Sequence, residues 1–260
     1  MHTTPLSDAA VQSNPLPPLR LVTYNIQAGI GSHRYRHFFT HGWRYVMPHR
    51  QSLSNLDRIA GVLEPYDIVG LQEADVGSFR TRFINQVHYL AESSGFSYWH
   101  SHITRDMGQL AQHGNSFLSH LRPTSIVETR LPASKHGRGV LEVEFEMGSR
   151  PLTIFITHLS LRRYSRLRQI RFLSRMINRK TSVVLMGDLN CEPQSPEYEY
   201  LIQNTTLQPA LCEQSTFPSW RPKKRIDHIL ATDNLILDEI RTIPSSLSDH
   251  LPVSARLQFR

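Results

Sequence analysis

A buried strand that ends in two polar side chains is the clearest chemical signal in the sequence. Residues 183–186 (VVLM) are apolar and run directly into Gly187-Asp188-Leu189-Asn190. An apolar run closed by glycine is typical of a buried strand that ends in a turn. In an open α/β sheet, ligands bind beyond the carboxyl ends of the strands. Taken alone, Asp188 and Asn190 are as consistent with the capping of a turn as with a functional site.

Further acids, amides and histidines stand at or near the ends of other apparent strands. Carboxylate and amide oxygens suit hard cations such as Mg²⁺, for which Mn²⁺ is a possible substitute. We therefore expect one metal-dependent site to gather the polar residues at these positions, which are Asn25, Glu73, His158, Asp227 and His250.

Other chemistries lack their sequence signals. No Gly-x-x-x-x-Gly-Lys or Gly-x-Ser-x-Gly motif is present, and no paired Cys/His spacing indicates a structural zinc. Metal-assisted hydrolysis remains, in which an ion neutralises phosphoryl oxygens while a base activates water. His158 and His250 are candidates to move protons or bind phosphate, with Asp227 to orient His250. An isolated histidine at a strand end is more often a satisfied polar group.

Helical periodicity predicts helices over residues 55–63, 79–93, 161–180 and 196–201. In the second of these, Phe83, Val87 and Leu90 form the inward face. In the third, arginines that include Arg162 and Arg166 lie off the apolar stripe, which is typical of a solvated helix face. Because the early arginines follow a strand end closely, Arg162 is also a candidate for contact with the substrate.

The middle of the chain predicts consecutive strands without intervening helices, which indicates antiparallel or mixed pairing. Within strand 139–146, glutamates alternate with apolar residues, as in a sheet with one solvated face. No repeat or linker interrupts residues 19–260, so we expect a single domain there. Besides residues 183–186, the predicted strands are 19–26, 67–73, 96–103, 114–119, 124–130, 139–146, 152–157, 226–230, 235–242 and 253–259.

The composition indicates a globular protein with a polyanionic partner. The 260 residues are 39% hydrophobic and 20% charged, and the formal net charge of +7 favours nucleic acid or an anionic membrane surface. Two cysteines, Cys191 and Cys212, give no disulfide framework and fit a reducing compartment. Residues 1–18 are polar and carry prolines, so we expect a disordered lead-in and no secretion signal. Since no apolar run reaches the ~18 residues of a membrane span, we expect a cytoplasmic protein.

Two basic, aromatic segments also bear on the partner. Residues 32–50 and 216–224 interleave arginines or lysines with aromatic rings. That composition suits nucleic acid, whose bases stack on rings while cations meet phosphates. It also suits a polar lipid surface, and the aromatic rings could simply pin each loop to the body of the protein.

The ordered arrangement of short motifs resembles the endonuclease/exonuclease/phosphatase superfamily, whose members resemble pancreatic-type deoxyribonuclease. The resemblance implies an α/β (α+β) four-layer sandwich, in which two mixed β-sheets pack face to face with helices on both outer faces. It spans residues 20–254 and rests on these blocks in order: Thr23-Tyr24-Asn25, Leu71-Gln72-Glu73, Thr157-His158-Leu159, Gly187-Asp188-Leu189-Asn190, Arg225-Ile226-Asp227 and Ser248-Asp249-His250.

The resemblance also implies a role for each matching residue. Glu73 resembles the principal metal ligand, with Asn25 beside it and Asp249 next to the metal. Asp188 resembles the group that orients or deprotonates the attacking water, and Asn190 helps to hold the water and the phosphate. His158 and His250 resemble the pair that flanks the scissile phosphate, with Asp227 in support of His250 and Asn115 near the phosphate.

The motif style is closest to the sphingomyelinase, deadenylase and broad nuclease group. Cys191 follows Asn190 where inositol polyphosphate 5-phosphatases carry arginine, so that branch is set aside. We expect a Mg²⁺-dependent phosphodiesterase that acts on nucleic acid and uses no organic cofactor. The alternatives are a phospholipid or sphingolipid phosphodiesterase, a small-phosphoester phosphatase, and a non-catalytic binding module that kept the fold. The oligomeric state is left open.

Overall fold

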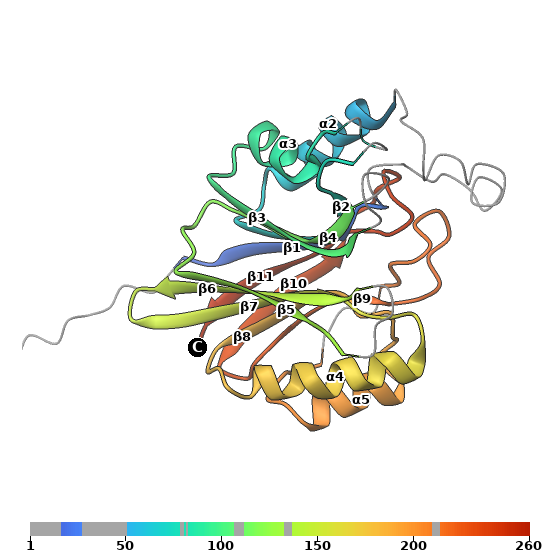
Figure 1. The fold of residues 1–260 in the computed structure, drawn as a ribbon. Coiled ribbons are helices and arrows are strands. Elements are labelled where there is room, and N and C mark those ends of the chain that lie inside the picture. The colour runs from blue at the N-terminus through green and yellow to red at the C-terminus, as the bar shows by residue number, and fades with distance from the viewer. Residues whose placement is uncertain are drawn as a thin grey trace, which may run out of the picture.

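The structure is a computed structural model that describes residues 17–27, 51–78, 81, 83–106, 112–132, 137–209 and 214–260. Two β-sheets lie face to face, with a pair of helices over the outer face of each (Figure 1). The predicted four-layer sandwich with mixed sheets is therefore confirmed. The expected disordered segment falls almost wholly, and residues 32–50 fall entirely, outside the described residues.

The larger sheet has six strands in the order β10-β11-β1-β2-β4-β3. Strands β1 and β2 run parallel, and every other neighbouring pair in this sheet is antiparallel. The strands are β1 (Leu19–Asn25), β2 (Ile68–Asp75), β3 (Tyr98–Asp106), β4 (Gln112–Ser119), β10 (Leu235–Thr242) and β11 (Val253–Phe259).

The smaller sheet has five strands in the order β5-β6-β7-β8-β9, in which only β7 and β8 run parallel. Antiparallel hairpins join β5 to β6 and β6 to β7, as the unbroken run of predicted strands indicated. The strands are β5 (Ser125–Arg130), β6 (Gly139–Met147), β7 (Arg150–His158), β8 (Val183–Asp188) and β9 (Asp227–Ala231).

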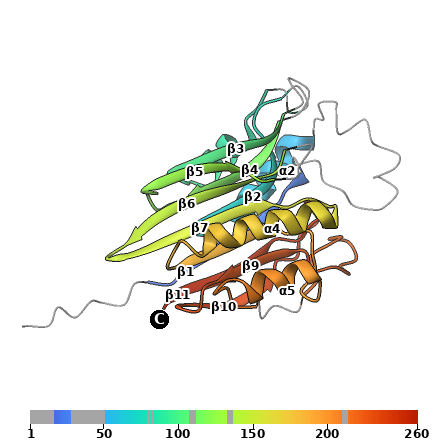
Figure 2. The same ribbon diagram turned by 60° about the horizontal axis from the view of Figure 1, so that its bottom comes forward.

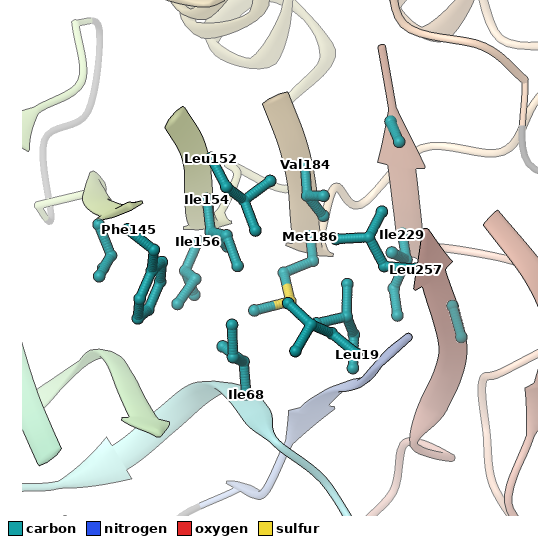
Figure 3. Close-up of a cluster of buried hydrophobic side chains, with 14 of the residues drawn as sticks. Leu19, Ile68, Phe145, Leu152, Ile154, Ile156, Val184, Met186, Ile229 and Leu257 are labelled. Atoms are coloured by element: carbon teal, nitrogen blue, oxygen red, sulfur yellow. The ribbon is translucent and has the colours of Figure 1, made fainter. Parts of the chain in front are cut away.

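The central core fills the space between the two sheets (Figure 3). Side chains from β7 and β8, including Ile154, Ile156 and Met186, meet Leu19 and Ile68 from the opposite sheet. All five are almost fully buried, so each sheet presents an apolar inner face to the other. This packing brings the carboxyl ends of β1, β7 and β8 to one edge of the sandwich.

Helices cover both outer faces and form two further cores. Helices α2 (Gln51–Leu63) and α3 (Gln86–Ser93) pack on the larger sheet. Helices α4 (Arg163–Ile177) and α5 (Pro196–Gln203) lie side by side on the smaller sheet (Figure 2). None of the described helices is long and apolar enough to span a membrane.

Helix α3 is shorter than the predicted helix 79–93. The side chain of Asn85 accepts hydrogen bonds from the backbone N–H groups of Val87 and His88, so it caps a helix that begins at Gln86. Phe83 lies before this cap in a left-handed conformation and is 63% exposed. Val87 and Leu90 are buried as predicted, but the assignment of Phe83 to the same face was wrong.

The outer face of the smaller sheet is less solvated than the alternation in β6 predicted. Glu142 is buried, and Nζ of Lys180 lies 2.6 Å from its carboxylate and 2.5 Å from that of Glu144. Lys180 follows the end of α4, so the helix layer covers part of this face. Alternation in sequence marks two faces of a strand, but it does not show whether the polar face meets water.

Candidate active site

A cleft of about 940 Å³ opens at the edge where the strand ends converge. It is lined by residues from both sheets and from the loops that join them. The sandwich therefore gathers side chains that lie far apart in sequence, as the motifs predicted. Of the predicted site residues, those that line the cleft are Asn25, Glu73, Asn115, His158, Asp188, Asn190, Asp249 and His250.

Asp188, the last residue of β8, lies at the centre of this group and is 2% exposed. Its Oδ2 accepts a hydrogen bond from Nδ2 of Asn25 at 3.2 Å, and its Oδ1 accepts one from the backbone N–H of Asn190 at 2.9 Å. Two histidine rings face Oδ2, with Nε2 of His158 at 3.2 Å and Nε2 of His250 at 3.9 Å. The carboxylate therefore serves as the hub of the site.

Burial, reinforced by the charge of Asp227, raises the pKa of Asp188 to about 7. A carboxylate with a pKa near neutrality is suited to accept a proton from water at physiological pH. Burial and the charges of Arg138 and His250 hold the pKa of His158 well below its ordinary value. His158 is therefore neutral at pH 7, and its ring lies against the Asp188 carboxylate.

The pKa of His250 is shifted in the opposite direction to that of His158, because the Asp227 carboxylate lies beside the His250 ring. Nδ1 of His250 lies 2.9 Å and 3.1 Å from the two carboxylate oxygens of Asp227, which is 3% exposed. Thr216 donates a hydrogen bond of 2.6 Å to the same carboxylate. Burial alone would lower the pKa of His250, but the charge of and hydrogen bond to Asp227, with the charge of Asp188, raise it to about 10.

Three side chains beside the His250–Asp227 pair carry oxygen atoms that suit a divalent metal ion. Asn25, Glu73 and Asp249 all line the cleft, and Ser248 connects two of them, since its Oγ hydrogen-bonds the Asn25 carbonyl at 2.7 Å and Asp249 Oδ1 at 3.3 Å. Burial and the charge of Glu73 raise the pKa of Asp249 to about 6, although the charge of His250 lowers it. Carboxylates placed close enough to repel one another are typical of a cation site.

The backbone at Glu73 also points to a functional position. Glu73 has a φ of 57° and interrupts the pairing of β2 with β4 between Gln72 and Ala74. A bulge of this kind re-aims a side chain, and a left-handed non-glycine residue costs of order 1–3 kcal/mol. The Glu73 carboxylate is directed to the cleft, where Oε1 lies 3.8 Å from Nδ1 of His158.

Asp188, Asp227 and His250 also bring their ligand atoms within 4.8 Å of one another. We interpret this group as a proton-handling unit, because Nδ1 of His250 is already bonded to Asp227. Mg²⁺ prefers oxygen ligands to imidazole, which favours the Asn25, Glu73 and Asp249 side of the cleft.

The loop after His158 is held by side chains from two other elements. Asn190, with a φ of 51°, donates from Nδ2 to the carbonyl of Leu159 at 3.0 Å. Arg166 of α4 donates to the carbonyls of Ser160 and Leu161 at 3.1 Å and 2.9 Å. Arg166 also donates from Nε and Nη2 to Glu197 Oε1 of α5, so a buried ion pair ties both helices to this loop.

Arg166 was expected on a solvated helix face, and that expectation was wrong, because the residue is 9% exposed and lines the cleft. Its spacing could have revealed this, since Arg166 falls on the same helical face as Ile170, Leu173 and Ile177, which are all buried. Arg162, predicted to contact the substrate, is exposed at the start of α4 and is not among the residues that line the cleft.

Asn115 of β4 is buried and donates from Nδ2 to the carbonyl of Gly139 at 2.7 Å. The hydroxyl of Thr157, next to His158, donates to the same carbonyl at 3.0 Å. Asn115 therefore joins the two sheets beside the cleft. Sequence reasoning missed this link, and it also missed Thr216, His113 and Arg138, because nothing in the local sequence marks them.

A sequence model of the endonuclease/exonuclease/phosphatase family matches residues 22–250. The chain belongs to the endonuclease/exonuclease/phosphatase family. Members of this family hydrolyse phosphoester bonds and in general use divalent metal ions. A comparison with curated protein sequences gave no match.

Solved structures of the endonuclease/exonuclease/phosphatase family share the fold at low sequence identity. The family protein of Beutenbergia cavernae DSM 12333 is 21% identical with a TM-score of 0.73, and the match covers 93% of this chain and 72% of that one. The human Nocturnin catalytic domain with bound sulfate is 19% identical with a TM-score of 0.68, and 94% of each chain is covered. The mannosyl-6-phosphatase of Bacteroides thetaiotaomicron VPI-5482 is 16% identical with a TM-score of 0.67, over 93% of this chain and all of that one.

Proposed function

We propose that this protein is a Mg²⁺-dependent phosphodiesterase whose substrate is nucleic acid, with residues 19–260 as one catalytic domain. The observation that carries the proposal is the position of Asp188, whose carboxylate meets both histidines at the edge of the cleft. With a pKa raised by burial to about 7, Asp188 removes a proton from the attacking water. Asn25 and Asn190 hold the carboxylate in place through their hydrogen bonds.

The two histidines have different tasks in this proposal. His250 is cationic at neutral pH because Asp227 supports it, so it binds the phosphoryl oxygens and stabilises the charge that develops on them. His158 is neutral and supplies a hydrogen bond to the phosphate. Asn25, Glu73 and Asp249 would hold Mg²⁺, which when bound neutralises the phosphoryl charge.

Nucleic acid is favoured by the charge of the chain and by one basic loop beside the cleft. The net charge of +7 attracts a polyanion. The basic loop comprises residues 214–226. Its Lys224 lines the cleft, and its Arg221 and Lys223 are exposed. The ring of Phe217 in this loop packs against the ring of His250, and the two ring centroids are 4.8 Å apart. This contact holds the loop beside His250.

A lipid or a small phosphoester is the second candidate, and the mouth of the cleft favours it. Leu161 lines the cleft and is 76% exposed, and Tyr164 is 73% exposed one turn further along. Exposed apolar side chains beside exposed arginines suit the surface of an anionic bilayer. The mannosyl-6-phosphatase that shares this fold supports a small phosphoester as an alternative substrate.

One substrate panel separates these candidates. Single- and double-stranded DNA, RNA, anionic phospholipid vesicles, mannose 6-phosphate and bis-p-nitrophenyl phosphate would be offered with Mg²⁺ and with EDTA. We expect cleavage of nucleic acid and of the generic diester with Mg²⁺ only, and affinity for nucleic acid that falls steeply with salt. Release of a lipid head group or of phosphate, with nucleic acid left intact, selects the second candidate.

A further inference from the structure

One corner of the cleft carries Arg138 and His113. Among the described residues, this corner is lined by Thr104, His113, Gly114, Asn115 and Arg138, none of which is acidic. The carboxylates that line the cleft are Glu73, Asp188, Glu192 and Asp249, and Glu73 lies beside this corner on β2, between the residues that pair with Asn115 and Gly114. The corner therefore offers donors suited to an anion next to the residues suited to a metal ion.

The backbone that carries Arg138 is held in place from both sheets. The carbonyl of the next residue, Gly139, accepts hydrogen bonds from Asn115 Nδ2 at 2.7 Å and from Thr157 Oγ1 at 3.0 Å. A Cβ at position 139 would lie 2.4 Å from the His102 ring and 2.8 Å from the Thr104 side chain. The backbone at Gly139 therefore packs closely against β3, and this packing fixes the position of the neighbouring Arg138 backbone.

This corner adjoins the reacting groups. In the pairing of β6 with β7, Val140 lies opposite Thr157, which places Arg138 and Gly139 next to His158. The charges of Arg138 and His113 both act on His158, where they add to burial in lowering its pKa. An anion held by Arg138 and His113 would therefore lie beside the phosphate that His158 contacts.

We propose that Arg138 and His113 bind a second phosphate of the substrate, one position away from the scissile phosphodiester. The inference rests on the proposed phosphodiesterase function and specifies its substrate. Hydrolysis requires only the diester, so further phosphate-binding side chains in the cleft set preference and affinity. Arginine forms paired, charge-assisted hydrogen bonds to phosphate, and the fixed backbone keeps this donor in place.

Two kinds of second phosphate share this chemistry. One is the next internal diester of a nucleic-acid strand, and the other is a terminal phosphate. A trinucleotide without terminal phosphates offers the first, and a dinucleotide with a 5′ or 3′ phosphate offers the second. A dinucleotide without terminal phosphates and bis-p-nitrophenyl phosphate offer neither.

The first test measures kcat/KM for these substrates with Mg²⁺ in wild type, Arg138→Gln and Arg179→Gln. Arg179 is exposed after α4 and is not among the residues that line the cleft, so its variant controls for loss of one positive charge. We expect wild type to favour substrates with a second phosphate by about tenfold. Arg138→Gln should lose that preference, while Arg179→Gln should keep it.

A binding experiment separates failure of this inference from failure of the proposed function. Calorimetry with Ca²⁺ in place of Mg²⁺ would compare thymidine 3′,5′-bisphosphate with thymidine 5′-monophosphate. We expect the bisphosphate to bind wild type about tenfold more tightly, and Arg138→Gln to bind the two within about twofold. Arg138→Lys, which keeps the charge without the paired donors, should give an intermediate ratio and covers the case in which Arg138→Gln does not fold.

Equal binding of the two nucleotides by wild type, or an unchanged ratio in Arg138→Gln, would overturn the second phosphate position. If no diester is cleaved with Mg²⁺ while the binding ratio behaves as expected, the proposed reaction fails and the anion-binding corner stands.

Discussion

Nδ1 of His250 faces both carboxylate oxygens of Asp227, at 2.9 Å and 3.1 Å. The pair joins the loop before β11 to the first residue of β9, and Thr216 fixes the carboxylate from a third segment. Because Asp227 is buried and does not line the cleft, it acts on the substrate through the groups in front of it, and its direct hydrogen-bond partner among them is the ring of His250. The relationship therefore predicts that Asp227 positions and charges His250.

The change Asp227→Asn tests this role. It keeps the shape of the side chain but removes the negative charge that raises the pKa of His250. We expect kcat for a phosphodiester to fall about 10²-fold or more with little change in KM. The alkaline limit of the pH–rate profile should also move to lower pH, since the cationic ring would lose its proton more readily.

Asp238→Asn is the matched control for that prediction. Asp238 pairs with Arg256 at 2.7 Å on β10 and β11 and is not among the residues that line the cleft. Its variant should keep the wild-type profile. An unshifted alkaline limit in Asp227→Asn, together with a kcat within about threefold of wild type, would refute the role of Asp227.

Arg166 is predicted to hold the loop after His158. In Arg166→Gln, the carbonyls of Ser160 and Leu161 lose their arginine donor, and the buried carboxylate of Glu197 keeps only the exposed Arg163 as a cationic neighbour. Because a buried carboxylate without its cation is costly, we expect the free energy of unfolding to fall by about 3 kcal/mol. We expect kcat to fall about tenfold as the loop loses its anchor.

Arg163→Gln provides the comparison, since Arg163 lies 3.5 Å from the same carboxylate but is 70% exposed. Denaturant unfolding should show a loss of less than about 1 kcal/mol for it. Equal losses in the two variants would contradict the structural role assigned to Arg166.

The strands and their order along the chain follow from the sequence because burial leaves a direct mark on it, whereas the four layers were implied by the resemblance to the family. Residues 183–186 of β8 are all apolar, since one face of the strand meets the other sheet and the other face meets helices. The residues at the ends of these strands then converge because the sheets pack face to face. The ordered motifs predicted that convergence before any geometry was known.

Charged side chains that the fold brings to the cleft from outside the motifs were not predictable in the same way. Arg138 and Arg166 are charged, and composition alone assigns charged residues to solvent. Whether a given arginine is exposed depends on its partner. The partner of Arg166 is Glu197, which lies 31 residues further along the sequence. The start of α3 was missed for a local reason, because the capping by Asn85 outweighs the helical periodicity that Phe83 extends.

Substitution of Gly187 by a residue with a side chain is predicted to destabilise the fold. It has a φ of 140°, and a Cβ there would lie 1.9 Å from the carbonyl oxygen of Thr157 on the neighbouring strand. Gly187→Ala must push β7 and β8 apart directly beside Asp188, so we expect a loss of at least about 3 kcal/mol in the free energy of unfolding. Gly61→Ala in α2, where nothing lies within 4 Å, should be neutral or stabilising by up to about 1 kcal/mol. Thermal and denaturant unfolding of both variants would check the contrast.

The buried ring of His228 is predicted to make the free energy of unfolding depend on pH below pH 7. Burial lowers its pKa to about 4, and one ring nitrogen lies 2.9 Å from the carbonyl oxygen of Cys191. Between pH 4 and about 6.5, the unfolded chain binds a proton that the folded chain refuses. The free energy of unfolding should therefore rise with pH across that window, by about 3 kcal/mol from this group.

Urea unfolding at a series of pH values would measure the slope. His228→Gln should flatten it between pH 4 and 6.5, while His88→Gln, on an exposed side chain, should not change it. A slope that is the same in wild type and His228→Gln would show that the ring is not held neutral by burial.

The most direct test of the account is the Mg²⁺-dependent rate of bis-p-nitrophenyl phosphate hydrolysis in wild type and in Asp188→Asn. The asparagine keeps the size of the side chain but cannot take a proton from water, whereas Asp233→Asn alters an exposed acid and serves as the control. The account predicts hydrolysis by wild type and Asp233→Asn that EDTA abolishes, and a rate at least about 10²-fold lower in Asp188→Asn. A wild-type rate that Mg²⁺ does not increase, or an Asp188→Asn rate within about threefold of wild type, would contradict it.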